Sequence, residues 1–201
     1  MKYKDSKFYR TMKILFSWWY FVWYNPKIIG KENIPIDGSF ILAGNHKSMM
    51  DPCALVVSTK RIIHFLAKDR YFNKKIIGNF FKYMQCIKVN TGVKNKDAMS
   101  NAIDVLNNGG AIGIFPEGTR NKTKEFLLPF KFGAVSMAKK TDSWIVPFGI
   151  TGDYKFRSKN LIIRFVKPFK VGNMELEEAN EKLFNEVKHL MLINKEVGGS
   201  N

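Results

Sequence analysis

The sequence predicts a single α/β domain with a largely parallel central sheet flanked by helices, preceded by an N-terminal helical segment. Short apolar runs that suit buried strands alternate with helical periods after residue 35. No internal repeat or low-complexity tract divides that part of the chain. The 201 residues, 45% of them hydrophobic, are sufficient for one well-packed core. These observations favour one α/β unit over several domains or disorder.

The N-terminal segment begins with five Lys and Arg residues before residue 14 and continues as ILFSWWYFVWY at residues 14–24. A membrane-spanning helix needs about 20 apolar residues, so this run is too short to span. Aromatic rings next to cations are typical of helices that lie in the membrane interface, and a buried core helix is the alternative. We therefore predict a membrane-interface helical segment at residues 1–34, an α/β domain at residues 35–201, and peripheral or monotopic attachment to the cytoplasmic face.

Six apolar runs are predicted to form the strands of the sheet. They lie at residues 39–44, 61–67, 84–90, 111–115, 144–150 and 161–169. Because helical segments separate most of these runs, parallel pairing through crossover helices is expected.

Three helices beyond the N-terminal segment follow from the spacing of apolar residues. In residues 97–107, apolar residues recur every three or four positions, and Gly109 lies just beyond the end of the predicted helix. Residues 132–140 form a shorter helix candidate. Residues 176–191 continue the same spacing and indicate a packing helix.

The chain is strongly basic, with 33 Lys and Arg against 17 Asp and Glu and a formal net charge of +16. Such a field attracts polyanions, including nucleic acid, anionic lipid headgroups and phosphorylated small molecules. No helix-turn-helix, RNA-binding or zinc signature is present, so a non-enzymatic basic protein that binds nucleic acid or membrane is the remote alternative. Two cysteines and three scattered histidines show no metal-ligand spacing, and no metal site is predicted.

The first candidate catalytic motif follows directly after the strand predicted at residues 39–44. Residues 45–51 read NHKSMMD. Asp51 and Pro52 look like the N-cap and first turn of a helix, so a compact turn would let the Asp51 carboxylate meet one imidazole nitrogen of His46. The other nitrogen would be free to take a proton from a substrate hydroxyl. Alternatively, Asp51 only caps a helix and His46 is an ordinary loop residue.

Cys53 offers a competing chemistry. It lies near the predicted helix start, where the helix dipole would lower the pKa of a thiol and make it a covalent nucleophile. The apolar residues 54–57 that follow favour a buried, unreactive cysteine instead.

A second polar motif, FPEGTR at residues 115–120, also follows a predicted strand. Gly118 lets the backbone approach a ligand, and Arg120 offers a planar fork of donors that suits phosphate. Glu117 would accept a hydrogen bond from a substrate hydroxyl or orient Arg120. A tight turn closed by a surface ion pair is the alternative.

NHxxxxD followed by FPEGTR resembles the glycerolipid acyltransferase family, which includes 1-acyl-glycerol-3-phosphate acyltransferases. The resemblance covers roughly residues 35–150 and includes Pro-Phe-Lys-x-Gly-Ala at residues 129–134. It implies that an acyltransferase catalytic domain moves a fatty acyl group from acyl-CoA or acyl-carrier protein to the 2-hydroxyl of 1-acyl-glycerol-3-phosphate, giving phosphatidate in phospholipid biosynthesis. A membrane lipid substrate and an anionic membrane surface are the implied partners, without nucleic acid and without a cofactor beyond the acyl donor.

The resemblance also implies roles for individual residues. His46 matches the general base, and Asp51 matches the residue that orients the imidazole. Lys68 matches a basic position that stabilises phosphate or the oxyanion. Backbone N–H groups near Asp51 and Pro52 are further candidates for stabilising the oxyanion. The acceptor-binding motif corresponds to Glu117, Gly118, Thr119 and Arg120, and a motif linked to acyl-donor binding corresponds to Val146 and Pro147.

One position departs from the family pattern. Many members end the strand corresponding to residues 87–90 with an arginine that assists phosphate binding, whereas this chain has Thr91. Lys88 or Lys94 would supply a charge there, but an ammonium group is a point charge without the planar fork of arginine. Glycerol-3-phosphate or another lysophospholipid is therefore the alternative acceptor.

Overall fold

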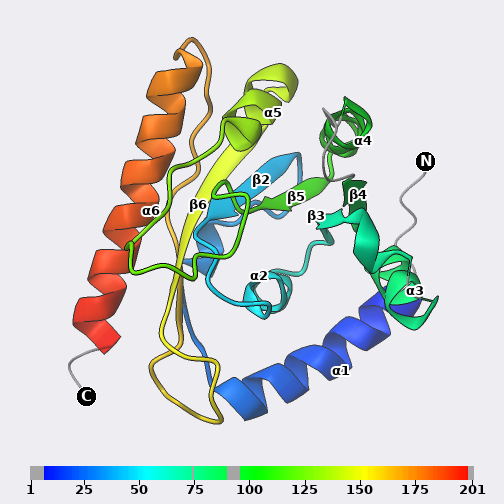
Figure 1. The fold of residues 1–201 in the computed structure, drawn as a ribbon, viewed down its shortest axis with the longest axis vertical. Coiled ribbons are helices and arrows are strands. Elements are labelled where there is room, and N and C mark those ends of the chain that lie inside the picture. Colours follow the sequence, from blue (N-terminus) through cyan, green and yellow to red (C-terminus); the bar gives the residue numbers. More distant parts are fainter. Residues whose placement is uncertain (1–6, 74, 90–95, 199–201) are drawn as a thin grey trace.

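The computed structural model of the chain describes residues 7–73, 75–89 and 96–198, and its centre is one seven-stranded sheet (Figure 1). The strand order is β1-β7-β6-β2-β5-β3-β4. Every neighbouring pair is parallel except β6 and β7, which confirms the largely parallel sheet. The strands are β1 (Lys27–Ile29), β2 (Phe40–Gly44), β3 (Ile63–Lys68), β4 (Ile87–Val89), β5 (Ala111–Ile114), β6 (Trp144–Thr151) and β7 (Ile162–Phe165).

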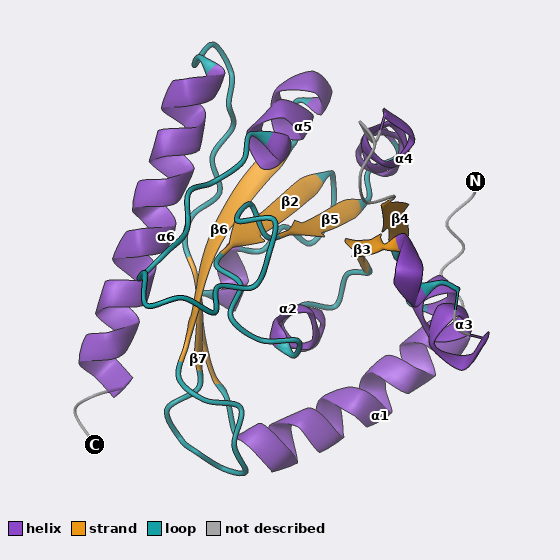
Figure 2. Cartoon of the chain, viewed as in Figure 1, coloured by secondary structure: helices purple, strands orange, loops and turns teal. Residues whose placement is uncertain are grey.

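Helices cover both faces of the sheet (Figure 2). Side chains alternate along β2, so Phe40 and Leu42 pack toward α1 and α2, while Ile41 and Ala43 pack toward α4, α5 and α6. Each face therefore has its own buried apolar cluster. The helices are α1 (Lys7–Tyr24), α2 (Asp51–Ser58), α3 (Lys75–Tyr83), α4 (Lys96–Asn107), α5 (Gly133–Thr141) and α6 (Leu176–Gly198), with short 3-10 turns η1 (Lys31–Asn33) and η2 (Asp69–Tyr71).

Two elements were not predicted from the sequence. Strand β1 has only three residues and exists because it pairs with β7 at the sheet edge, a partner more than 130 residues away. Helix α3 contains Gly78, which interrupts the helical pattern of the sequence. A Cβ on Gly78 would lie 2.2 Å from the Phe72 carbonyl oxygen, so close backbone packing requires glycine there.

Helix α1 has one buried and one exposed apolar side. Tyr20 is fully buried and Tyr24 is 8% exposed, both in the cluster that contains Phe40 and Leu42. On the other side, Ile14 and Trp18 are 69% and 70% exposed. Helix α1 thus shares the core of the α/β domain, and the boundary at residue 34 stays a prediction. Across the described part of the chain, every helix is too short or too polar to cross a bilayer.

The parallel strands β2, β3 and β5 end at the same edge of the sheet. The NHKSMMD loop follows β2, and the FPEGTR loop follows β5. The carboxyl ends of parallel strands are where α/β folds place their ligands, because loops from several strands converge there. The fold therefore brings the two motifs together although they are far apart in sequence.

Candidate active site

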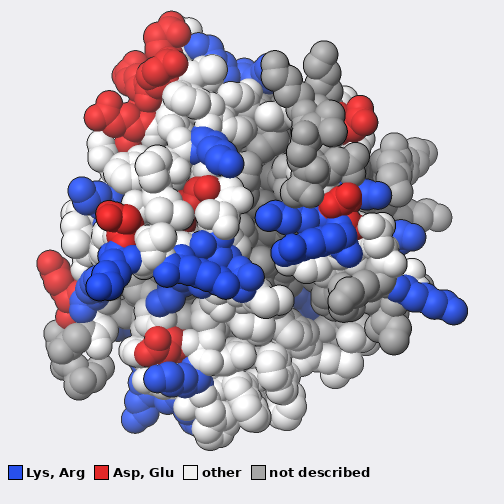
Figure 3. All heavy atoms as spheres, in the orientation of Figure 1, with Lys and Arg blue, Asp and Glu red and all other residues white. Residues whose placement is uncertain are grey.

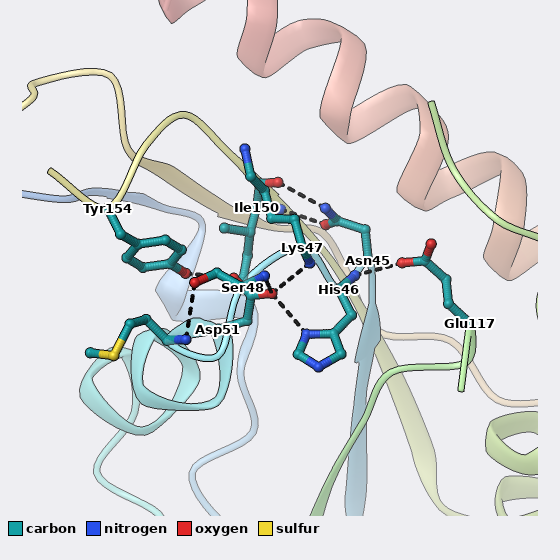
Figure 4. A network of polar contacts seen from close by, with 9 residues as sticks. Asn45, His46, Lys47, Ser48, Asp51, Glu117, Ile150 and Tyr154 are labelled. Carbon is teal, nitrogen blue, oxygen red and sulfur yellow. Dashed lines mark hydrogen bonds and ion pairs between the residues drawn. The ribbon is translucent and has the colours of Figure 1, made fainter. Parts of the chain in front are cut away.

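His46, in the loop after β2, and Asp51, the first residue of α2, form a close pair (Figure 4). His46 Nδ1 lies 2.8 Å from Asp51 Oδ2. The Asp51 side chain is fully buried, whereas 17% of the His46 side chain is exposed. The compact turn expected from the sequence brings these two groups together, with the imidazole between a buried carboxylate and the surface.

Asp51 is not the N-cap of α2, which corrects the sequence-based assignment. Met50 precedes the helix, and Asp51 is its first residue. The Asp51 carboxylate points back into the loop, where Oδ2 accepts hydrogen bonds of 2.7 Å from the N–H groups of Lys47 and Ser48. Its carboxylate therefore folds the loop around the histidine, whereas an N-cap would bind the N–H groups of the helix that follows.

These bonds determine which nitrogen of His46 carries a proton. An ionised carboxylate only accepts hydrogen bonds, so Nδ1 of His46 donates to Asp51. Nε2 then presents its lone pair, and no described residue forms a hydrogen bond with it. The imidazole stacks on the Phe115 ring with centroids 4.0 Å apart and planes 18° apart. Carboxylate and aromatic ring together hold the imidazole in one orientation.

Glu117 does not pair with Arg120, contrary to one of the two sequence-based expectations. It is 4% exposed, and no ion pair between described residues joins it to Arg120. Its Oε1 accepts a 2.6 Å hydrogen bond from the His46 N–H, and Oε2 accepts one of 3.0 Å from the Leu128 N–H. Burial raises the pKa of Glu117, although the His46 N–H partly offsets this effect. Glu117 thus holds the backbone of the candidate base.

The rest of the FPEGTR loop also packs around His46. The Asn121 N–H donates a 2.7 Å hydrogen bond to the His46 carbonyl oxygen, so the loop holds this residue from both sides. Gly118 has φ +69°, a conformation that favours glycine, and the Lys131 side chain lies over its Cα. A side chain at position 118 would be strained at this φ, which explains the glycine in this motif, whereas the flexible end of Lys131 could move aside.

Basic side chains stand at the ends of two neighbouring strands, Lys68 at the end of β3 and Arg120 in the loop after β5. Arg120 is partly exposed, while Thr119 and Lys68 are exposed. A hydrogen bond from Arg70 lowers the pKa of Tyr71, and the charges of Arg120 and Lys68 lower it further. Arg120 and Lys68 therefore lie within electrostatic range of one hydroxyl. Figure 3 shows Lys and Arg side chains on both sides of a hollow in the middle of this face.

Lys88 does not join this basic group. In the register of β3 and β4, Lys68 lies opposite Val89, and Lys88 lies opposite Ala67. Since successive side chains of a strand leave opposite faces of the sheet, the two lysines point to different sides. The remaining positions considered for this charge, Thr91 and Lys94, lie outside the described residues.

Two further sequence-based assignments concern the acyl donor and the oxyanion. Val146 and Pro147 are buried inside β6, opposite Leu42 and Ala43, so their link to acyl-donor binding stays a prediction. Most N–H groups near Asp51 cannot form an oxyanion hole, because they already donate within the loop and Pro52 has none, and the role stays a prediction for the N–H groups of Met49 and Cys53. The occupied N–H groups are those of Lys47, Ser48, Met50 and Asp51. Lys68 remains a candidate for that interaction.

Cys53 is not an activated nucleophile. Burial raises the pKa of its thiol to about 11, and the nearby Asp51 carboxylate acts in the same direction. The effect of burial outweighs the helix dipole that the sequence suggested. Within the described part of the chain, no group of three or more His, Cys, Asp or Glu side chains could hold a metal ion.

The structure adds two residues that the sequence-based assignment missed. Asn45 is 2% exposed, and its side chain forms two hydrogen bonds with the backbone of Ile150, which fixes the end of β2 against β6. Its place directly before His46 was the available signal. Tyr154 donates a 2.7 Å hydrogen bond from its hydroxyl to Asp51 Oδ1. No sequence signal marks Tyr154, which lies 103 residues from Asp51.

With this geometry established, comparison with known proteins places the chain in a family. Residues 25–151 match the acyltransferase family. The chain therefore belongs to the acyltransferase family, which confirms the family predicted from the two motifs.

Individual relatives are consistent with this assignment. The chain is 33% identical to a 1-acyl-sn-glycerol-3-phosphate acyltransferase of Bacillus subtilis over 151 residues, which are 75% of this chain and 70% of the relative. It is 34% identical to a protein of the same name from Borreliella burgdorferi, over 67% of this chain and 54% of that relative. Its structure resembles the crystal structure of the LPA acyltransferase PlsC from Thermotoga maritima with a TM-score of 0.75 at 25% identity, covering 94% of this chain and 79% of the other.

Proposed function

We propose that this acyltransferase moves a fatty acyl group from a thioester, acyl-CoA or acyl-carrier protein, to the 2-hydroxyl of 1-acyl-sn-glycerol-3-phosphate, giving phosphatidate. The observation that carries the proposal is the 2.8 Å contact between His46 and the buried Asp51, which leaves Nε2 of His46 to act as general base. The names of the relatives support the acceptor.

The reaction needs a base, and His46 has the geometry of one. Nε2 takes the proton from the 2-hydroxyl while that oxygen attacks the thioester carbonyl carbon. The tetrahedral intermediate then collapses, the carbon–sulfur bond breaks, and the departing thiolate takes the proton from the imidazolium. Asp51 stabilises the imidazolium that exists between these steps, and such positioned acid–base catalysis contributes typically about 10²–10⁴-fold in rate.

The acceptor phosphate requires cations, which the surroundings of His46 provide. Arg120 offers a planar fork that binds phosphate through two hydrogen bonds, and Lys68 adds a point charge within range of the same hydroxyl of Tyr71. We assign Arg120 to the phosphate and Lys68 to the phosphate or the developing oxyanion.

A lipid acceptor also requires attachment to a membrane surface. Ile14, Leu15 and Trp18 on α1 are 69%, 59% and 70% exposed, and exposed apolar side chains of this size favour burial in the lipid interface. The net charge of +16 would draw the chain to an anionic surface, such as the cytoplasmic face of a membrane. We therefore propose peripheral attachment through the exposed side of α1.

Acyl transfer from labelled acyl-CoA and acyl-carrier protein to lysophosphatidate in mixed micelles tests the proposal. We expect phosphatidate from the wild type and from His189→Ala, a control in which an exposed histidine of α6 is removed. His46→Ala should form at least 100-fold less product, in line with the loss of a general base. The relative rates with the two thioesters identify the donor.

Two outcomes would contradict the proposal. Full activity of folded His46→Ala would exclude the general base. Wild-type protein that acylates glycerol-3-phosphate or another lysolipid, but forms no phosphatidate, would exclude the acceptor.

A further inference from the structure

The Asp51 carboxylate has a second partner on the side away from His46 (Figure 4). Oδ2 faces His46, whereas Oδ1 accepts a 2.7 Å hydrogen bond from the Tyr154 hydroxyl. Among the described residues, no other side chain bonds to Oδ1. The orientation of the carboxylate, and with it that of the imidazole, therefore depends on this hydroxyl as well as on the N–H groups that bind Oδ2.

The segment at residues 152–160, which carries Tyr154, is held by the end of α1. The Tyr154 ring packs edge-on against Tyr24 with centroids 5.5 Å apart. The Arg157 N–H donates a 2.7 Å hydrogen bond to the Trp23 carbonyl oxygen, and the Phe156 ring packs on Trp23 at 5.0 Å. These contacts limit the positions that the Tyr154 hydroxyl can adopt.

One further contact and the surroundings of this hydroxyl keep it in place as a donor. The Lys47 ammonium group donates a 2.6 Å hydrogen bond to the Gly152 carbonyl oxygen, which ties the segment to the loop of His46. Burial, and next the Asp51 charge, raise the pKa of Tyr154, so the hydroxyl keeps its proton. The Tyr20 hydroxyl is also buried, and among the described residues it has no hydrogen-bond partner at normal distance and angle. The Tyr154 hydroxyl nevertheless lies close enough to influence the pKa of Tyr20.

We propose that Tyr154 is a positioning residue of the reaction: its hydroxyl holds the Asp51 carboxylate in the rotation that directs the imidazole of His46. The proposal rests on the function assigned above. Without the hydroxyl, Oδ1 is a buried acceptor with no donor, and the carboxylate gains freedom to turn away from His46. Tyr154 touches neither His46 nor the reacting atoms, so its loss should slow catalysis without weakening substrate binding.

Tyr154→Phe tests this proposal because it removes the hydroxyl and keeps the ring against Tyr24. The matched control is Tyr24→Phe, which removes a hydroxyl from the same buried cluster but has no hydrogen bond to Asp51. We expect kcat of Tyr154→Phe to fall about 10-fold or more, as for loss of one hydrogen bond to a charged group, while both KM values stay within about twofold. Tyr24→Phe should match the wild type.

A spectroscopic measurement separates positioning from a purely structural role. In proton NMR, the signal of the His46 Nδ1–H, assigned by its absence in His46→Ala, should lie further upfield in Tyr154→Phe. A carboxylate that has turned away from His46 accepts a longer and weaker hydrogen bond from the Nδ1–H, so this proton is less deshielded. Tyr24→Phe should leave this signal unchanged.

The proposal would be overturned if kcat of Tyr154→Phe were unchanged, or if kcat/KM fell only because KM rose. An Nδ1–H signal at the wild-type position, or a Tyr154→Phe protein that no longer folds, would also overturn it. Failure of the proposed function has a different signature. Wild-type protein that forms no phosphatidate, or an active His46→Ala variant, would contradict the reaction, and the NMR comparison would still report the contact between Tyr154 and Asp51.

Discussion

Glu117 accepts a 2.6 Å hydrogen bond from the backbone N–H of His46, a residue 71 positions earlier in the chain. The acidic residue of the second motif thus holds the histidine of the first. Its second oxygen binds the Leu128 N–H, so one buried carboxylate joins three segments of the chain. This explains in physical terms why both motifs belong to one site.

Glu117→Gln should therefore impair catalysis through the position of His46. The amide has one oxygen, so at least one of the two buried N–H groups loses its acceptor, at a cost of about 1–3 kcal/mol in the free energy of unfolding. We expect kcat to fall about 10-fold or more, since misplacing a catalytic group by about 1 Å can cost 100-fold. Steady-state kinetics and urea unfolding measure both effects. Glu125→Gln, in the exposed part of the same loop, is the control and should match the wild type.

The pH dependence of stability should show the ionisation of Glu117. Because burial raises the pKa of Glu117 above its ordinary value of 4.5, the folded state binds more protons than the unfolded state in the interval above that value. The contribution of Glu117 to stability therefore falls as pH rises through this interval. Urea unfolding of the wild type and Glu117→Gln between pH 4 and about 7 measures this effect. As pH rises, the free energy of unfolding of the wild type should fall relative to that of Glu117→Gln. A wild type that becomes more stable relative to Glu117→Gln as pH rises would contradict a raised pKa of Glu117.

Cys53 should be unreactive at neutral pH. With a pKa of about 11, its thiol carries almost no thiolate at pH 7.5. We expect slow alkylation by iodoacetamide in the native protein and fast alkylation in urea, followed by mass spectrometry of the peptide. Cys53→Ala should keep kcat within about twofold, because the proposed reaction forms no acyl-enzyme. An inactive but folded Cys53→Ala, with an acyl group trapped on the wild-type thiol, would contradict the mechanism.

Arg120→Ala should weaken binding of the acceptor. Loss of a hydrogen bond to a charged group costs about 1.5–3 kcal/mol, so KM for lysophosphatidate should rise about 10-fold or more. Arg120→Lys should recover part of this loss, because it keeps the charge and loses the fork. Lys124→Ala, an exposed cation in the same loop, controls for net charge. If Arg120→Ala raises the KM for lysophosphatidate no more than Lys124→Ala does, Arg120 does not contact the phosphate.

The exposed side of α1 should control membrane binding. Leu15 on α1 and Leu192 on α6 are 59% and 45% exposed, which makes them a matched pair. Leu15→Glu should reduce flotation with anionic vesicles several-fold, because it places a carboxylate in the proposed lipid contact. Leu192→Glu should float like the wild type. Point substitution is preferable to deletion of residues 1–24, since deletion would also remove Tyr20 and Tyr24 from the core.

The strands and the two motif loops were predictable because their signals are local. Apolar runs such as residues 39–44 and 111–115 correspond to β2 and β5, and each motif follows its strand directly. The His46–Asp51 turn was also expected, since only five positions separate the two residues. By contrast, β1 owes its existence to an edge partner, and sequence periodicity does not report such a partner.

The resemblance to a family assigned roles to residues but did not reveal the direction in which each side chain points. Glu117 belongs to the acceptor-binding motif, yet its carboxylate points inward to backbone N–H groups. Lys68 and Lys88 both looked suited to phosphate, but strand register directs them to opposite faces. Register and burial arise from pairing between distant strands, so a single sequence contains little information about them.

The sequence by itself determined the α/β class, the family and the identity of the His46–Asp51 pair, because hydrophobic periodicity and short motifs are encoded within a few neighbouring residues. Only the tertiary structure decided that Glu117 holds the His46 backbone, that Cys53 is too buried to ionise, and that Tyr154 binds the far oxygen of Asp51. Each of these depends on desolvation or on a hydrogen bond between segments far apart in sequence, and both come into existence only when the chain packs.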